Sequence, residues 1–234
     1  MIGEIFKESE KMNLPFWINS TRRKFKIGTH DGFFHADDVL ALALLKRMFW
    51  CDFEIIRTRD KMILDGCDML VDVGGKYDGK RYFDHHHDKN LPCSVSLVWT
   101  AVWIWGGVDD FVYEYVNKTV LDSVSMLDTD LEKAISELGR EDVYYNISSL
   151  LSDFNSVDNG FEIALDVAGK FWMAILARGE AVKKEREVLL SGEIGVTEFS
   201  KNKYIILGEG VDIRNHLGWF EGKGIRFAVH PHYN

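Results

Sequence analysis

The sequence predicts an α/β fold with a mainly parallel sheet covered by helices, followed by a helical connector and a small α+β C-terminal domain. The first observation behind this prediction is an alternation of short apolar segments with a helical one. Strands are expected at 24–29, 53–58 and 69–73, and a buried helix with acids in its first turn at 37–50. Strand–helix–strand alternation of this kind is typical of parallel sheets with helices on their faces.

The second observation is a change of periodicity along the chain. Helices are expected at 94–105, 109–123, 131–138 and 142–152, and one long helix or two over 161–190. Strands return at 195–199, 204–207 and 225–229. We therefore expect an N-terminal extension over 1–23, a main domain over 24–160, a helical connector over 161–191 and a small domain over 192–234, with the functional site in the cleft between the domains.

Composition and charge limit the classes of protein to consider. The 234 residues are 46% hydrophobic and 28% charged, which is ordinary for a globular protein, and no apolar run approaches the roughly 20 residues of a membrane span. The net charge of −9 argues against a protein that coats duplex nucleic acid with a basic face. It does not argue against a nuclease, because site carboxylates contribute to that charge and divalent cations reverse its sign locally.

The compartment is expected to be intracellular. The first residues contain no apolar core of a signal peptide, and Glu4, Glu8 and Glu10 disfavour a mitochondrial presequence. The three cysteines, Cys51, Cys67 and Cys93, have no paired spacing, which favours a reducing compartment. We therefore expect a cytoplasmic or nuclear protein, with mitochondria less favoured, and no membrane association.

Histidines and aspartates gather where the predicted strands end. The candidate site residues are His30, His35, Asp37, Asp72, Asp84, His85, His86 and Asp158. His30 directly follows the first strand, and His35 and Asp37 follow within the same short loop. Asp72 lies at the end of the third strand, and Asp158 follows a helical region. Ligands of open α/β sheets bind outside the carboxyl ends of the strands, so several of these segments should deliver side chains to one edge.

These residue types suit a pair of metal ions. A set of imidazoles and carboxylates fits manganese, zinc or iron better than an all-oxygen magnesium site. Two metals about 3.5–4 Å apart need a bridging carboxylate, for which Asp72 is the candidate. Such metals lower the pKa of a bound water, generate hydroxide near neutral pH and neutralise a phosphoryl group during attack.

Other polar residues near these segments have simpler interpretations. His87 is equally well a surface residue, and Gly74-Gly75 and Asn159-Gly160 are expected to supply positive φ. Arg57 and Arg59 leave the second strand beside the proposed site, so they are candidates for phosphate contact or for salt bridges. His230 and His232 are interpreted as terminal surface residues.

Taken together, these segments resemble the DHH phosphoesterase superfamily and, within it, the melanocyte-proliferating-gene exonuclease family. The matching segments occur in the family's order and cover most of residues 24–160. They are IGTHDGFFHADDVLA at 27–41, IIRTRD at 55–60, CDMLVDVGGKYD at 67–78, RYFDHHH at 81–87 and SVDNG at 156–160. The set is highly specific, although any one segment alone is weak.

The resemblance implies roles for these residues. One metal would be held by His30, His35 and Asp72, and the other by Asp37, Asp72, His85 and Asp158. Asp84 would orient His85, and His86 would face the phosphate. Arg214 and His216 lie in a stretch similar to the family's second domain and are candidates for substrate binding. Two divalent ions, with manganese favoured over magnesium or zinc, are implied as cofactors.

The chain departs from the family pattern at several positions. Asp31 stands where the family usually has Asn, Ala36 where it often has Cys, and Asn155 where it usually has Asp. None of these removes an expected ligand. Family members usually continue further, with a Gly-rich segment, so the second domain is expected to be reduced or incomplete. We expect this difference to affect processivity and substrate choice more than metal binding.

The resemblance implies a metal-dependent phosphodiester hydrolase, a 3′→5′ exonuclease acting on single-stranded RNA or short oligonucleotides. One alternative is a phosphatase or pyrophosphatase of the same superfamily that acts on small substrates, which the acidic charge and short second domain favour. Another is a non-catalytic metal-binding scaffold, which the intact set of expected ligands disfavours. The sequence leaves the physiological metal, the direction of cleavage and the oligomeric state open.

Overall fold

The computed structural model describes residues 24–48, 53–139, 143, 146–191, 196–199, 202–206 and 211–229. Expectations for the N-terminal extension, Cys51, His230 and His232 lie outside these ranges. The chain divides into two compact units, Met1–Leu176 and Ala177–Asn234. Each unit is described by itself below.

The first unit is built on a four-stranded parallel sheet with the strand order β2-β1-β3-β4. Its strands are β1 (Phe25–Thr29), β2 (Phe53–Arg57), β3 (Met69–Val71) and β4 (Tyr82–Phe83). The three strands expected from the sequence are confirmed, each within two residues of its predicted end. The two-residue β4 is too short to give a recognisable strand pattern, and its apolar pair was not predicted as a strand.

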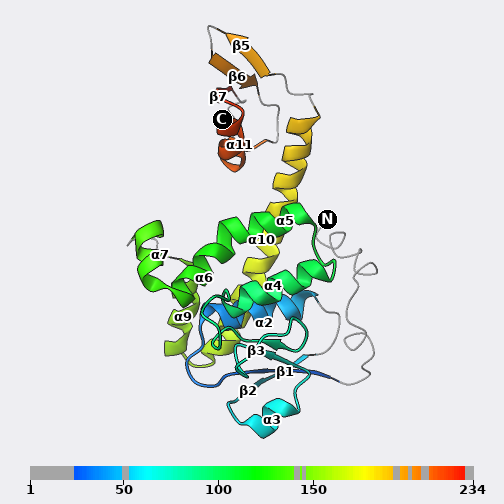
Figure 1. The fold of residues 1–234 in the computed structure, drawn as a ribbon, viewed down its shortest axis with the longest axis vertical. Helices are drawn as coiled ribbons and strands as arrows, with labels where there is room; N and C mark the ends of the chain where they lie inside the picture. The colour runs from blue at the N-terminus through cyan, green and yellow to red at the C-terminus, as the bar shows by residue number, and fades with distance from the viewer. Residues whose placement is uncertain are drawn as a thin grey trace. The chain divides into compact units, whose positions relative to one another are not determined.

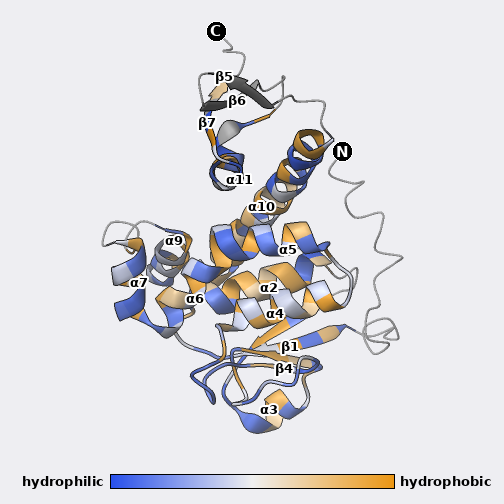
Figure 2. Cartoon of the chain, turned by 45° about the horizontal axis from the view of Figure 1, so that its top comes forward, coloured by the Kyte–Doolittle hydropathy of each residue, from blue (hydrophilic) through white to orange (hydrophobic). Residues whose placement is uncertain are grey.

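Helices α2 (Ala36–Met48) and α4 (Ser94–Ile104) pack against one another and cover one face of the sheet (Figure 1). Figure 2 shows hydrophobic residues concentrated on these two helices, whereas α7 (Leu131–Leu138) is largely hydrophilic. The main core lies here, and Trp99 stacks on Trp172 with ring centroids 5.4 Å apart. The indole of Trp172 also donates a hydrogen bond of 2.8 Å to the Leu40 carbonyl.

The short helix α3 (Lys61–Asp65) lies on the opposite side of the sheet (Figure 1). Its Leu64 forms a small second core with Cys67 and Leu70. Gly28 of β1 makes this close packing possible, because a Cβ at that position would meet Leu70 at 2.7 Å and Leu64 at 2.8 Å. Neither α3 nor its core was predicted from the sequence.

The expected helix at 109–123 is interrupted and extends further than predicted. It consists of α5 (Asp110–Val116), a π-helical turn (Asn117–Leu121) and α6 (Asp122–Thr129). The segment ends at Asp130, whose side chain accepts a hydrogen bond from the Lys133 N–H and caps α7. The helical segment was expected to end at Ser123, but it continues to the cap formed by Asp130.

The helices expected at 94–105 and 131–138 are confirmed, whereas the one expected at 142–152 begins only at Ile147 in the part of the chain that is described. Helix α9 (Ile147–Asp153) has an Asn146 capping box and is followed by a 3-10 turn (Phe154–Ser156). The expected helix over 161–190 is confirmed as one continuous helix, α10 (Gly160–Leu190). No helix among the described residues is long and apolar enough to span a membrane.

The second unit contains the end of α10 and a three-stranded sheet with the order β5-β6-β7. Strands β5 (Val196–Phe199) and β6 (Asn202–Ile206) are antiparallel, and β6 and β7 (Ile225–Val229) are parallel. A 3-10 turn (Ile213–His216) and α11 (Leu217–Gly222) connect the last two strands. The buried cluster of this unit is Leu189, Phe220 and Ile225.

The Trp172 hydrogen bond should contribute measurably to stability. We expect Trp172→Phe to lower the free energy of unfolding by about 1–3 kcal/mol, because a fully buried indole loses its partner and part of its packing. Trp103→Phe is the matched control, since the indole of Trp103 bonds to Asp110 at the surface. Urea denaturation of both variants tests this, and equal losses would contradict it.

Candidate metal centre

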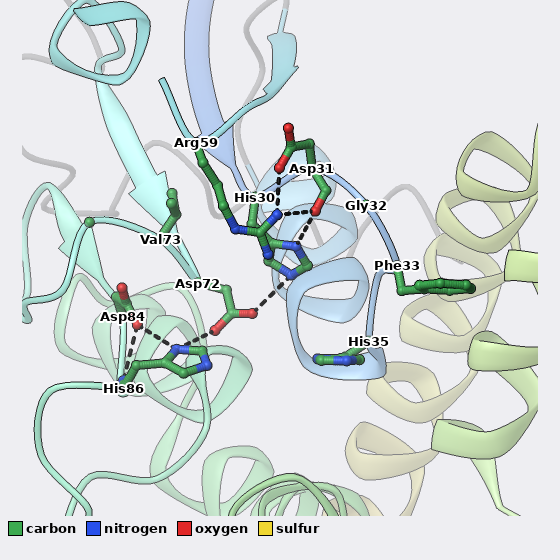
Figure 3. A pocket seen from close by; sticks show the side chains of 11 residues that line it. His30, Asp31, Gly32, Phe33, His35, Arg59, Asp72, Val73, Asp84 and His86 are labelled. Carbon is green, nitrogen blue, oxygen red and sulfur yellow. Dashed lines mark hydrogen bonds and ion pairs between the residues drawn. The ribbon is translucent and has the colours of Figure 1, made fainter. Parts of the chain in front are cut away.

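The sheet topology brings three of the predicted segments to one edge. His30 directly follows β1, Asp72 follows β3, and the Asp84-His85-His86 run follows β4. These strands are neighbours and parallel, so their carboxyl ends meet at one edge of the sheet, where open α/β sheets bind ligands. Figure 3 shows Asp72 between His30 on one side and His86 on the other.

Asp72 is held in an unusual backbone conformation. Its φ of 55° is in the left-handed region, which aspartate tolerates better than most residues, and its N–H donates to the Phe83 carbonyl of β4 at 3.0 Å. The following Gly74 and Gly75 also have positive φ, as predicted. The chain therefore turns sharply at the end of β3 and leaves the buried Asp72 carboxylate at the edge of the sheet.

The two carboxylate oxygens of Asp72 face different histidines. Oδ2 lies 3.3 Å from Nε2 of His30, whereas Oδ1 lies 3.4 Å from Nε2 of His85 and 3.5 Å from Nδ1 of His86. The hydroxyl of Ser94, the first residue of α4, donates to Oδ1 at 2.9 Å and fixes the carboxylate.

Among the described residues, three groups of side chains place candidate ligand atoms within 4.8 Å of one another. They are His30, His35 and Asp72; Asp72, His85 and His86; and His35, Asp37 and Asp128. Asp72 belongs to two groups and His35 to two. The side chains thus form adjoining groups that share members, which is the arrangement that two neighbouring metal ions require.

Unsatisfied buried atoms support a cation in this place. Nε2 of His30, Oδ1 of Asp37 and Oδ2 of Asp38 are buried and make no hydrogen bond of good geometry. Buried polar atoms normally have partners. The separations of 3.2–3.5 Å among several candidate ligand atoms also match one coordination shell, because metal–ligand bonds of about 2.1 Å place neighbouring ligands about 3.0–3.4 Å apart. The residues therefore fit divalent metal ions.

Asp84 pairs with His86 rather than with His85, for which the resemblance implied it. Its Oδ1 accepts hydrogen bonds from the His86 N–H at 3.0 Å and lies 2.8 Å from Nδ1 of His86, and its Oδ2 accepts from the Gly75 N–H at 2.6 Å. His85 instead has Asp72 and Asp128 beside Nε2. The buried Asp84 carboxylate therefore positions the exposed His86 ring.

Asp128 stands in the site where Asp158 was expected. Asp128, near the end of α6, places Oδ2 3.2 Å from Nε2 of His85 and belongs to the group with His35 and Asp37. Asp158 is exposed in the turn before α10 and belongs to none of the three groups. No local signal marked Asp128, because it reaches the site through the packing of α6 on α2.

Ser94 and Asp38 are also site residues that the sequence did not single out. The Ser94 N–H donates to Oδ2 of Asp37 at 3.3 Å, so the start of α4 contacts both buried carboxylates. Asp38 accepts hydrogen bonds from the N–H groups of His35 and Val39, and its Oδ2 lies 3.3 Å from Nε2 of His30. Asp38 therefore fixes the start of α2 and faces a candidate ligand.

The buried aspartates of the site have shifted pKa values, which are raised for Asp37 and Asp38 and lowered for Asp72. Burial, with Asp72 and Asp128 nearby, raises the pKa of Asp37 well above its usual value. Burial raises the pKa of Asp38 to about 7. Burial also acts to raise the pKa of Asp72, but the proximity of His30, His85 and Ser94 outweighs it and lowers the pKa below its usual range. Asp72 is thus the carboxylate kept ionised.

The neighbouring carboxylates raise the pKa values of two histidines of the site. The neighbouring Asp72 raises the pKa of His30. Burial acts to lower the pKa of His85, but Asp128 and Asp72 outweigh it and raise the pKa to about 10. In the absence of metal, the proton on His85 compensates buried negative charge, and bound metal ions would replace that proton.

Arg57 and Arg59 bind the loop that follows β1. Arg57 donates to the Gly32 carbonyl at 2.5 Å and lies over the Phe161 ring, 4.4 Å from its centroid. Arg59 donates to the Asp31 carbonyl at 2.6 Å and pairs with the Asp31 side chain. Both expected arginines are therefore near the site. Arg59 lines the pocket of about 540 Å³ that contains His30, His35, Asp72 and His86.

Arg214 and His216 belong to the second unit and have partners there. Arg214 pairs with Asp212 at 2.8 Å and is exposed. His216 is buried, and its Nε2 lies 2.8 Å from Oε2 of Glu185 in α10. Burial lowers the pKa of His216. These contacts join the 3-10 turn to the end of α10, so both residues have a structural role within the second unit.

The fold and the site together define a class: an α/β protein whose parallel sheet carries adjoining His/Asp groups, joined by one aspartate, at its carboxyl edge. The chain belongs to the MYG1 exonuclease family, described as uncharacterised protein family UPF0160, whose family model matches residues 26–168. The match covers the four-stranded sheet except Phe25, every candidate metal ligand and Asp158.

Several curated relatives share this region. The chain is 56% identical over 137 residues to a MYG1 protein of Schizosaccharomyces pombe, over 58% of this chain and 40% of the relative. It is 33% identical over 141 residues to the human MYG1 exonuclease, over 58% of this chain and 35% of the relative. It is 34% identical over 138 residues to a MYG1 protein of Chlamydia muridarum, over 57% of this chain and 46% of the relative. The matched region spans less than half the length of these relatives. No solved structure matches the chain.

A pair of matched substitutions separates Asp128 from Asp158. We expect Asp128→Asn to weaken Mn²⁺ binding by about tenfold or more, because it removes a charged candidate ligand beside His85. Asp158→Asn makes the same chemical change at an exposed position and should leave binding within about twofold. Calorimetric titration measures both. The reverse order would place Asp158, and not Asp128, on the metal.

Metal binding should release protons and strengthen with pH. A histidine ligates only when deprotonated, and the raised pKa of His85, about 10, keeps it protonated below that pH in the metal-free protein. Mn²⁺ affinity should therefore rise by up to about tenfold per pH unit for each proton released between pH 6 and 8. Titration in buffers of different ionisation enthalpy counts the protons. An affinity independent of pH would contradict this assignment.

Proposed function

We propose that the chain is a metal-dependent phosphodiester hydrolase that removes nucleotides from the 3′ end of single-stranded RNA. The observation that carries this proposal is the position of Asp72, whose two oxygens face two different histidines at the carboxyl edge of the sheet. A carboxylate so placed suits a bridge between two metal ions. The names of the mammalian relatives, MYG1 exonucleases, support the same chemistry. The 3′→5′ direction follows the expectation for the family.

The charge of the site also requires bound cations for such a reaction. The carboxylates of Asp37, Asp38 and Asp72 are all buried here; Asp72 is kept ionised, and its charge, with that of either neighbour once it loses its proton, would repel a phosphodiester. Two bound divalent ions would supply a water of lowered pKa and positive charge opposite the phosphate. The residues expected to hold them are His30, His35, Asp37, Asp72, His85 and Asp128.

His86 is positioned to contact the phosphate. Asp84 accepts the Nδ1–H of His86, and the ring is 60% exposed and lines the pocket. Its Nε2 is therefore available to the pocket and, in the protonated ring, donates a hydrogen bond to a phosphate oxygen or a proton to the leaving oxygen. Asp84 is the residue that holds this ring in place.

The lining of the pocket favours a phosphodiester over pyrophosphate. Of the described residues that line it, only Arg59 carries a permanent positive charge, and Asp31 already pairs with it. A highly charged pyrophosphate would need more cationic partners than a phosphodiester with one charge per phosphate. The small-substrate phosphatase nevertheless remains the main rival, and the product analysis below separates the two.

Labelled RNA should be shortened from its 3′ end. With Mn²⁺ present, a 5′-labelled single-stranded oligoribonucleotide should give a descending ladder, and a duplex should be degraded poorly. Intact RNA with rapid hydrolysis of pyrophosphate or a small phosphate ester would instead support the small-substrate enzyme. Hydrolysis of neither, with metals bound, would support the non-catalytic scaffold.

Asp72→Asn should abolish this activity and keep the fold. We expect a loss of at least about 100-fold in kcat, because the amide removes the charge shared by the two groups. Asparagine also tolerates the left-handed backbone of this position. Asp166→Asn, an exposed change on α10, is the control. Circular dichroism and a thermal melt check folding. Near-normal turnover of folded Asp72→Asn would refute the shared-carboxylate mechanism.

A further inference from the structure

Phe33 is exposed at the edge of the candidate metal pocket. Its side chain is 76% exposed, and it lines the same pocket as His35, Asp72 and Arg59. In the view of Figure 3, the ring lies beyond His35 and points away from the carboxylates. Single exposed apolar side chains are common and need no explanation by themselves. The position of this ring beside a cation and the candidate ligands is the informative feature.

The backbone on both sides of Phe33 is fixed. On one side, Arg59 binds the Asp31 carbonyl and Arg57 binds the Gly32 carbonyl. On the other side, Asn155 accepts from the Phe34 N–H at 3.0 Å and donates to the Phe34 carbonyl at 2.8 Å. The Phe34 ring itself is buried against Phe161. The loop therefore presents Phe33 outward from a rigid base, which lowers the entropy lost when a ligand stacks on it.

We propose that Phe33 is a stacking platform for a base of a single-stranded nucleic acid whose phosphate lies at the metal centre. The inference rests on the proposed phosphodiesterase function and adds a residue that binds the substrate. An exposed aromatic ring next to a charged pocket is the combination by which proteins hold single strands without reading their sequence. Inorganic pyrophosphate has no apolar face to contact the ring, and duplex bases are already stacked on their neighbours.

Arg59 completes the geometry of this site. A Cβ on Gly32 would lie 3.8 Å from Nη1 of Arg59, so the guanidinium runs alongside the residue that precedes Phe33. The edge of the pocket thus holds the Arg59 guanidinium, which pairs with Asp31, beside the residue that precedes the exposed Phe33 ring. A nucleotide presents the matching pair, a phosphate and a base, on neighbouring parts of its structure.

Substitution of Phe33 tests the proposal through kinetics. On a single-stranded oligoribonucleotide, Phe33→Ala should lower kcat/KM by about 5- to 150-fold, the range that loss of one stacked base gives. Phe33→Trp should retain activity and Phe33→Leu should lose most of it, because leucine keeps the apolar area without the aromatic face. Ile104→Ala is the matched control, since it removes an exposed apolar side chain at the opposite end of α4 from Ser94.

The substrate supplies the second half of the test. Oligonucleotides with an abasic site at each terminal position in turn should include one on which wild type and Phe33→Ala have equal kcat/KM, since the stacked base is missing from both. Active wild type and unchanged Phe33→Ala on the intact strand would overturn the stacking role alone.

A binding measurement distinguishes failure of this inference from failure of the exonuclease proposal. With Mn²⁺ present and rapid mixing, a strand carrying 2-aminopurine near its 3′ end should lose fluorescence on binding wild type, before any cleavage, but not on binding Phe33→Ala. Quenching without cleavage would support the platform and overturn the exonuclease. Absence of quenching with the wild type would overturn the platform, whatever the outcome of the cleavage assay.

Discussion

The position of the Asp72 carboxylate is the constraint on which the rest of the site depends. Asp72 lies at the end of β3, a strand with β1 on one side and β4 on the other, so the residues that follow those two strands approach it from opposite directions. The left-handed backbone at Asp72 and the glycines after it turn the chain away and leave the side chain at the sheet edge. A residue that avoided this conformation would move the carboxylate away from both histidine groups.

The second constraint is the charge of a largely buried cluster. Asp37, Asp38 and Asp72 lie next to one another with almost no exposure, which is costly unless the charges are compensated. In the metal-free protein burial raises the pKa values of Asp37 and Asp38 and so reduces the negative charge, while the raised pKa values of His30 and His85 and the Ser94 N–H and hydroxyl compensate the charge that remains. Protons and metal ions therefore compete for the same positions, and the site couples metal affinity to pH.

One loop connects the metal centre with the surface where substrate would bind. Between β1 and α2 it carries His30 and His35, and between them the exposed Phe33. Asn155 holds this loop by both accepting from and donating to the Phe34 backbone. An ionised aspartate, the residue that the family pattern usually has at this position, would have no proton to donate to the Phe34 carbonyl. The substitution therefore strengthens the attachment of the loop in this chain.

The sequence by itself determined every described strand except β4, the long helix α10 and the residues that follow β1, β3 and β4. Their signals are local: apolar runs, helical periodicity and polar residues directly after a strand, which parallel pairing then brings to one edge. The positive φ of Gly74 and Gly75 was likewise predictable, because glycine adopts it without steric cost.

Only the tertiary structure decided which distant side chains complete the site. Asp128 and Ser94 reach it from helices whose orientation depends on packing against α2, so neither stands beside a strand end in the sequence. The pairing of Asp84 with His86 depends on the path of the chain after β4. The exposure of Asp158 depends on the turn before α10. Contacts between residues far apart in the chain arise from the packing of whole helices and strands, and local sequence patterns do not predict that packing.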